Sequence, residues 1–184
     1  MSYALPTSLM VCGVEYDINS DYRAALDIFA ALNDPELTDA DRAYVVMDII
    51  YTDIDKIPYS HRQDALKEAL IFLNGGKEEK PQQQKSPVLV SWEQDFSYIV
   101  SPVNRIIGQE IRSMEYLHWW TFLSAFYEIG DCTFAQIVRI RDQKARGKKL
   151  DKSDAEWYRE NRDIVDIKTT YTEKEKETLS AWGV

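Results

Sequence analysis

Apolar residues recur along most of the chain at the spacing of an amphipathic α-helix. Leu66, Ala69, Leu70 and Leu73 follow the i, i+3, i+4, i+7 rule that places side chains on one helix face. The same spacing, in full or in part, is present in three other stretches: Ala25–Leu32, Val46–Ile50 and Trp119–Phe126. We therefore expect a series of short helices, each with one face to bury.

The segment Leu9–Ile18 has a different pattern, with β-prone residues on both sides of Cys12-Gly13. Glycine readily adopts the backbone conformation that a tight turn between two strands needs. A two-stranded hairpin is only marginally stable by itself in water. The pattern thus predicts a hairpin that packs on the helices after it.

Helix starts are marked by a recurring capping box. In this motif a Ser or Thr oxygen accepts the amide three residues on, and an acidic or amide side chain at that position reaches back. The matches are Thr38 with Asp41, Ser60 with Gln63, Ser91 with Gln94, Thr133 with Gln136, Ser153 with Glu156, and Thr172 with Glu175. Together they predict helices along the chain after the hairpin.

Glycine and proline mark two further boundaries. Asn74-Gly75-Gly76 is typical of a left-handed cap that ends a helix. Ser101-Pro102 interrupts the helical run from Trp92 to Ile111, and predicts either a kink or a new helix with Pro102 in its first turn.

These signals predict a mainly α fold, with an N-terminal β-hairpin followed by about six to eight short amphipathic helices in a compact helical bundle. From Lys77 to Pro87 no side chain other than proline is apolar, which is typical of a linker or an exposed loop. We expect four segments: residues 1–76 with the hairpin and three helices, 77–88 as a flexible Gln/Lys/Pro linker, 89–168 as a helical C-terminal part, and 169–184 as a polar tail.

The charge is distributed unevenly over these segments. The chain has a formal net charge of -9. Residues 1–76 contain 13 acidic and 5 basic residues, so most of this negative charge lies there. A negative surface repels phosphate backbones and anionic lipids, so neither nucleic acid nor a membrane is an expected partner. No stretch has the length and apolar character of a signal peptide or a membrane span, so we expect the protein to stay where it is made.

Residues that could support catalysis or metal binding do not form a complete site. Glu115 and His118 have the Glu-x-x-His spacing of a di-iron helix, but that site needs the pair twice and no second pair is present. Cys12 and Cys132 are far apart in sequence and lack nearby histidines. We predict that the chain is not an enzyme and uses no cofactor or metal. A partly buried histidine beside the tryptophans is the expected role of His118.

Four aromatic residues are candidates for binding a protein partner. Trp119 and Trp120 are adjacent, and neighbours on a helix point about 100° apart, so both rings cannot lie centrally on one narrow buried stripe. Either this helix is buried on two sides or one ring faces a partner. Trp92 and Phe126 are also candidates, with core packing as the alternative for each of the four rings.

Arg139 and Arg141 begin a basic cluster that continues to Lys149, and they are the other candidates for partner binding. One interpretation is a contact with nucleic acid or with an acidic partner. A second, favoured because no aromatic residues are interleaved for base stacking, is that these cations stabilise the helix dipole before Gly147. A third is pairing with the acidic residues 1–76.

Several stretches, in this order and spacing, resemble the family called bacteriophage gene product fifteen. They are Leu5–Leu9, Tyr16–Asn19, Asp34–Leu37, Ala69–Gly76, Trp92–Asp95, Leu117–Trp120 and Ile137–Arg141. The resemblance covers nearly the whole chain, to about Ile167. It implies a phage or prophage protein in the cytoplasm of a bacterial host, encoded between the major tail protein and the tape-measure protein.

The role that the resemblance implies is that of a tail-assembly chaperone. Such a protein coats the helix-prone tape-measure protein, keeps it in solution and is displaced as tail-tube subunits polymerise. A structural component of the virion, such as a tail or head-tail connector subunit, is the alternative, and a small helical enzyme is a third hypothesis. The client segment and the oligomeric state are left open.

Overall fold

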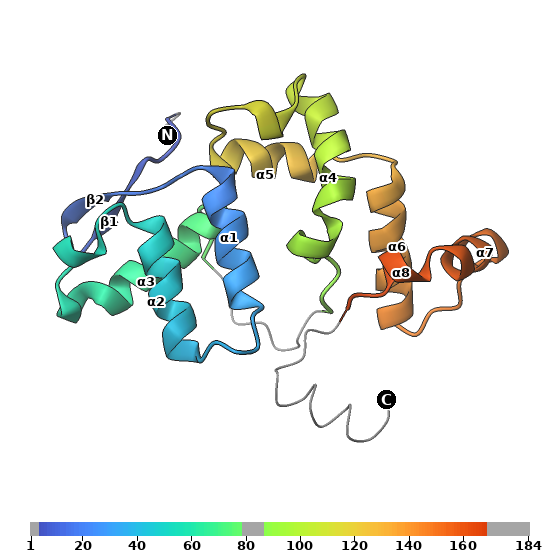
Figure 1. Cartoon of the computed structure of the whole chain (residues 1–184), viewed down its shortest axis with the longest axis horizontal. Helices are drawn as coiled ribbons and strands as arrows, with labels where there is room; N and C mark the ends of the chain where they lie inside the picture. Colours follow the sequence, from blue (N-terminus) through green and yellow to red (C-terminus); the bar gives the residue numbers. More distant parts are fainter. Residues whose placement is uncertain (1–3, 79–86, 169–184) are drawn as a thin grey trace. The chain divides into compact units, whose positions relative to one another are not determined.

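The computed structural model describes residues 4–78 and 87–168 (Figure 1). Two short strands are followed by helices, which confirms the predicted mainly α fold with an N-terminal hairpin. The chain divides into two compact units. In the described residues the first unit comprises 4–78 together with His118–Trp120, and the second comprises 87–117 and 121–168.

The hairpin of the first unit consists of β1 (Ser8–Val11) and β2 (Val14–Asp17), paired antiparallel with Val11 opposite Val14. Cys12 and Gly13 between them both have positive φ, at 49° and 83°. Positive φ at both central residues matches the right-handed twist of the flanking strands, as the sequence predicts for this turn. Ser8 to Val11 then pack against α3 (Arg62–Leu73).

Three α-helices complete the first unit: α1 (Tyr22–Leu32), α2 (Asp39–Ile50) and α3. Two short 3-10 turns, Ile54–Lys56 and Tyr59–His61, connect α2 to α3. The fully buried side chains include Val11, Tyr22, Ile28, Ile50 and Phe72. The core of this unit therefore lies between the hairpin and the three helices.

The second unit is entirely helical in its described residues. Its elements are α4 (Trp92–Ile107), a 3-10 turn at Ile111–Ser113, α5 (Trp119–Tyr127), α6 (Thr133–Ala145), α7 (Lys152–Glu160) and α8 (Arg162–Val165). Ile137 and Ile140 of α6 form a core with Val165 of α8, and Trp157 and Tyr158 pack around it. Helix α5 starts with two residues that belong to the first unit.

Some predicted boundaries are wrong. Ser60 lies within a 3-10 turn and does not cap α3, which begins at Arg62 without a side-chain cap. Likewise Thr133 is the first residue of α6, with Cys132 before it, and α7 begins two residues early because Asp151 accepts the amide of Asp154. Thr172 lies outside the described residues.

Other boundary predictions are confirmed. Thr38 and Asp41 form a complete capping box, and Ser91 accepts the amide of Gln94 at the start of α4. Helix α4 continues through Pro102, so of the two alternatives at Ser101-Pro102, a kink or a new helix, the new helix is wrong. The proposed separation of the chain by a linker at 77–88 stays a prediction, since 79–86 lie outside the described residues, as does the tail 169–184. The units differ from the predicted segments in one respect: His118–Trp120 belongs to the first unit, although it lies within the predicted C-terminal part 89–168.

Candidate functional site

The segment His118–Trp120 caps the C-terminal end of α3. The indole Nε1 of Trp119 donates to the carbonyl oxygen of Leu73 over 2.9 Å, and that of Trp120 donates to Phe72 over 2.8 Å. The last four carbonyls of a helix have no partner within it, so donors from outside must satisfy them when the end is buried. Two adjacent tryptophans, from far along the sequence, perform this function here.

The glycines after α3 satisfy the remaining carbonyls. The amides of Gly75 and Gly76 donate to Phe72 and Ile71 over 3.0 and 2.9 Å, and the amide of Asn74 donates to Leu70 over 3.0 Å. This is the Schellman arrangement that the Asn-Gly-Gly sequence predicts. With the two indoles, every carbonyl of the last turn has a donor.

Gly76 is required at its position for two reasons. Its φ is +81°, in the left-handed region that side chains other than glycine rarely adopt. A Cβ at this position would lie 2.9 Å from Cη2 of Trp120, too close to the indole for an ordinary contact. The Trp120 ring also stacks on Phe72, with ring centroids 5.8 Å apart. A residue other than glycine at position 76 would therefore both strain the turn and collide with the Trp120 ring.

His118 positions the tryptophans. Its side chain is buried, its Nε2 lies 2.9 Å from the carbonyl oxygen of Pro6, and its Nδ1 accepts the amide of Trp120 over 3.0 Å. The Nδ1 bond requires the tautomer with the proton on Nε2, which then donates to Pro6. The histidine expected to be partly buried beside the tryptophans is fully buried, and its bond to Pro6 connects the segment to the N-terminal residues.

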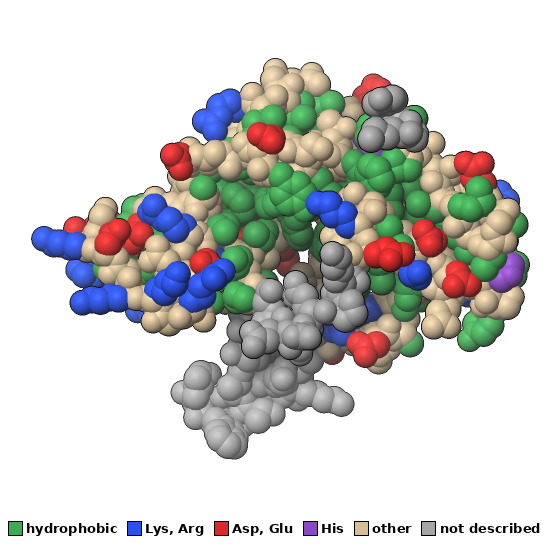
Figure 2. All heavy atoms as spheres, turned by 180° about the vertical axis from the view of Figure 1, so that it is seen from behind, with side chains coloured by type: hydrophobic (Ala, Val, Ile, Leu, Met, Phe, Trp, Pro, Cys, Tyr) green, Lys and Arg blue, Asp and Glu red, His purple; other side chains and the backbone are tan. Residues whose placement is uncertain are grey.

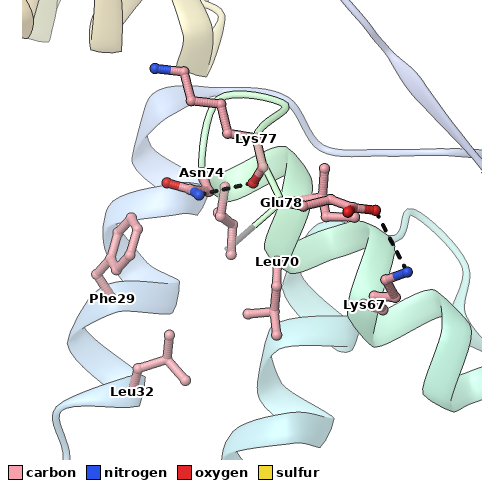
Figure 3. Close-up of a pocket in the computed structure, with 9 residues that line it drawn as sticks. Phe29, Leu32, Lys67, Leu70, Asn74, Lys77 and Glu78 are labelled. Carbon is pink, nitrogen blue, oxygen red and sulfur yellow. Dashed lines mark hydrogen bonds and ion pairs between the residues drawn. The ribbon is translucent and has the colours of Figure 1, made fainter. Parts of the chain in front are cut away.

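A pocket of about 400 Å³ opens beside this capped helix end, and all of its lining belongs to the first unit (Figure 3). Phe29 and Leu32 extend into it from α1, and Leu70 extends from α3. Phe29 also contacts Trp119, with ring centroids 5.8 Å apart. The other lining residues are Lys67, Ile71, Leu73, Asn74, Lys77 and Glu78. The site is thus an apolar pocket between two helices, with polar residues at one end.

The polar residues at this end mostly bond to one another. Lys67 and Glu78 form an ion pair at 3.8 Å, and the Asn74 side-chain amide donates to the carbonyl of Lys77 over 2.9 Å. Within residues 4–78 and 87–168, no carboxylate lies within ion-pair distance of the Lys77 ammonium. Lys77 is therefore a cation at the pocket that has no ion pair with a described carboxylate.

Of the four aromatic candidates, Trp92 and Phe126 lie in the second unit. Their ring centroids are 4.8 Å apart, and Phe126 also contacts Phe134 at 5.6 Å. Trp119 is fully buried, whereas Trp120, Trp92 and Phe126 are half-buried. Each of the four rings contacts another ring of its own unit, and their role in partner binding stays a prediction.

Arg141 is buried and its guanidinium is fully used inside the second unit. It forms two bonds to the Asp95 carboxylate, at 2.5 and 2.9 Å, and Asp95 is itself fully buried. Three further bonds go to the carbonyls of Leu89, Ile164 and Val165. A direct contact between this guanidinium and a partner would require the unit to open, so the structure gives Arg141 a stabilising role that the sequence did not indicate.

Arg139 is more accessible than Arg141. Its guanidinium donates to the Asp154 carboxylate over 2.5 Å, and its side chain is 57% exposed. Figure 2 shows Lys and Arg side chains gathered over the end of the second unit formed by α6 to α8. Partner binding through Arg139 stays a prediction.

Within the described part of the chain, no group of three or more His, Cys, Asp and Glu side chains is arranged to hold a metal ion. In the same residues no helix is both long and apolar enough to span a membrane. The pocket beside α3 is therefore the feature from which a function is best argued.

The sequence model of the family described as "Bacteriophage Gp15 protein" matches residues 1–167. The chain belongs to the bacteriophage Gp15 family. Neither a curated protein nor a solved structure matches it. Membership identifies the chain as a phage structural or assembly protein.

Two of the stretches that carry the resemblance to the Gp15 family meet in space. Ala69–Gly76 forms the end of α3 and its glycine turn, and Leu117–Trp120 contains the histidine and the two tryptophans that cap it. The sequence indicated both stretches but not their contact. The pocket was missed, because Phe29 and Leu70 were assigned to buried helix faces, whereas Leu70 is 44% exposed.

Proposed function

We propose that this Gp15-family chain is a tail-assembly chaperone, which binds the tape-measure protein while the phage tail is built and is absent from the finished particle. The family supports a role in phage structure or assembly. The observation that carries the finer proposal is the apolar pocket between α1 and α3, because a chaperone needs an open apolar surface for its client.

The form of the pocket suits a helical client. Two helices with facing apolar side chains form the kind of groove that receives the apolar face of an amphipathic helix. A tape-measure protein is expected to be long and rich in such helices. The acidic surplus of residues 1–76 gives the complex a net charge that opposes aggregation while the apolar surfaces are covered.

The decisive experiment is co-expression of the chain with the tape-measure protein of the same phage. We expect the tape-measure protein to remain in the supernatant and to co-purify with the chain. Expression of the tape-measure protein alone provides the baseline, and we expect it to sediment. A tape-measure protein that sediments equally with and without the chain would contradict the proposal.

A structural component of the virion is the alternative function. It predicts that purified phage particles contain the chain in a fixed ratio to the major tail protein. The chaperone proposal predicts that the chain is present in infected cells and absent from particles. Quantitative mass spectrometry of both samples separates the two.

A further inference from the structure

We propose that the pocket between α1 and α3 binds an amphipathic helix of a partner protein whose apolar stripe is flanked by a carboxylate that pairs with Lys77. This inference rests on the proposed chaperone function, because it names the site and the chemistry by which the client is held.

The lining favours apolar side chains of a protein over a small polar ligand. Phe29 and Leu32 are spaced i, i+3 on α1, and Leu70 and Ile71 lie one turn after Lys67 on α3. A small-molecule site has several polar groups that converge on the ligand. Here the polar side chains of Lys67, Glu78 and Asn74 already have partners.

The capped end of α3 excludes one other mode of recognition. The C-terminal end of a helix attracts cations through its unpaired carbonyls and its dipole. The carbonyls of Leu70, Ile71, Phe72 and Leu73 all accept bonds from within the first unit. A partner at the pocket therefore meets an apolar surface and an ammonium group, with no carbonyl of this last turn left unpaired.

The charges at the pocket decide the sign of the flanking residue. Among the described lining residues the only carboxylate is that of Glu78, which is paired with Lys67, so within these residues Lys77 leaves a positive surplus. Of the other Lys and Arg side chains of residues 4–78, Arg23, Arg42 and Lys56 pair with aspartates. Arg62 lies over the Tyr59 ring without an ion pair to a described carboxylate, and it is not among the residues that line the pocket. The negative charge of the rest of the unit is screened beyond about 10 Å at 0.1 M salt, whereas Lys77 lies in the contact itself.

The first test uses two synthetic helical peptides with the full-length chain. Both carry the same leucine stripe at i, i+3, i+4 and i+7, flanked by glutamates in one peptide and by lysines in the other. We expect the wild-type chain to bind the glutamate peptide several-fold more tightly, as measured by calorimetry. Equal affinities, or no binding of the glutamate peptide, would overturn the inference.

Substitutions then locate the binding. Lys77→Glu should weaken binding of the glutamate peptide and strengthen that of the lysine peptide, each about two- to fivefold, because exposed ion pairs are individually weak. Lys56→Glu is the matched control, since it makes the same change of charge on the same unit away from the pocket. Leu70→Glu should reduce binding of the glutamate peptide at least tenfold. Its control is Tyr59→Glu, in the 3-10 turn before α3, where the residue is 88% exposed.

Co-purification of the same variants with the tape-measure protein separates this inference from the proposed function. If wild type and Leu70→Glu retain the tape-measure protein equally, the chaperone function holds and the pocket is not its site. If wild type does not retain it, the function fails whatever the peptides do.

Two other occupants have distinct results, and either would overturn the inference. A second copy of this chain would give a wild-type dimer that Leu70→Glu converts to a monomer. Residues 169–184 as the occupant would make a chain ending at Lys168 bind both peptides much more tightly than the full chain does.

Discussion

Arg141 shows how one residue holds separate segments together. A guanidinium has five N–H donors, and those of Arg141 bond to the Asp95 carboxylate and to three backbone carbonyls. These acceptors lie before α4, on α4 and on α8. The amide of Ser91 also donates to Asp95 over 2.9 Å, so the start of α4 depends on the same carboxylate.

Removal of this guanidinium is expected to destabilise the chain strongly. Arg141→Ala leaves the Asp95 carboxylate buried and unpaired, which costs about 3–5 kcal/mol. Arg146→Ala is the control, since Arg146 makes an exposed i, i+4 pair with Asp142 and its loss costs at most about 0.5 kcal/mol. Urea unfolding measures both. Equal midpoints for the two variants would show that the buried pair does not stabilise the fold.

The contact between Gly76 and Trp120 makes a second prediction at this scale. Gly76→Ala is strained by its positive φ, at about 1–2 kcal/mol, and also clashes with the indole. Gly108 has nearly the same φ, at +85°, and a Cβ there would meet nothing within 4 Å, so Gly108→Ala has the strain alone. We expect Gly76→Ala to be clearly the less stable variant by urea unfolding. A cost equal to that of Gly108→Ala would mean that the indole moves aside freely.

Helix starts are the features at the scale of elements that the sequence predicts only in part. The predicted caps at Thr38 and Ser91 are confirmed, because each side chain lies where the chain enters the helix, although only Thr38 forms the complete box. Ser60 has the same local sequence, but a 3-10 turn precedes α3 and the oxygen is in the wrong place. Since α3 and α6 begin without a side-chain cap, the local motif is neither necessary nor sufficient, and packing of the whole unit decides where each helix begins.

The same limit explains what was missed at the site. Local patterns identified the hairpin from its turn residues, the end of α3 from its glycines and the aromatic helix from its periodicity, since each depends on neighbours in sequence. The bonds of Trp119 and Trp120 to α3, the pairing of Asp95 with Arg141, and the opening of the pocket beside Leu70 join residues more than thirty positions apart. No local pattern contains that information.

Capping therefore gives a paired prediction. Thr38→Ala removes the oxygen that accepts the Asp41 amide and should cost about 1 kcal/mol of unfolding free energy. Ser60→Ala, at a position with the same sequence signal but no cap, should change it by less than about 0.5 kcal/mol. Urea unfolding of the two variants compares them directly, and a larger loss for Ser60→Ala would show that the motif acts in spite of the 3-10 turn.

The junction between α2 and α3 is expected to be sensitive to alkaline pH. Tyr51 follows α2, and its hydroxyl donates to the Ala65 carbonyl of α3 over 2.8 Å. Burial, followed by the nearby charges of Glu68 and Tyr16, raises the pKa of Tyr51 well above its ordinary value. Its contribution to stability is therefore complete below pH of about 10, the pKa of an unfolded tyrosine, and is lost as the pH rises above that value.

Tyr51→Phe tests this dependence. The variant loses the hydrogen bond at neutral pH, but its stability should fall less steeply than that of wild type between pH 9 and about 11. Thermal unfolding over this pH range, followed by circular dichroism, gives both slopes. Parallel slopes would show that other groups control the alkaline transition.

At the scale of the whole molecule, the chain's first unit is discontinuous in sequence. Residues 4–78 form most of it, and His118–Trp120 returns to complete the end of α3. The amide of Trp119 donates to the carbonyl of Ser20 over 2.7 Å, and the Trp119 side chain is fully buried. A division of the chain at residues 77–88 would therefore separate the first unit from part of its own core.

This connectivity predicts the behaviour of a fragment. Residues 1–78 alone should be much less stable than the same residues in the full chain, because Phe72 and the α3 carbonyls lose the groups that cover them. Residues 1–78 contain no tryptophan, so a peptide of residues 116–127 can be followed by its own fluorescence. We expect addition of the fragment to shift the emission to shorter wavelength as the indoles become buried, and to raise the midpoint of thermal unfolding.

A peptide of the same composition in scrambled order should do neither. If instead the fragment unfolds cooperatively at the temperature of the full chain and does not bind the peptide, the tryptophans do not contribute to the stability of the end of α3. The expected result would make the return of His118–Trp120 a condition for forming the pocket, since Phe29, which lines it, rests on Trp119. Client binding would then depend on the continuity of the whole chain, although every residue of the pocket lies before position 79.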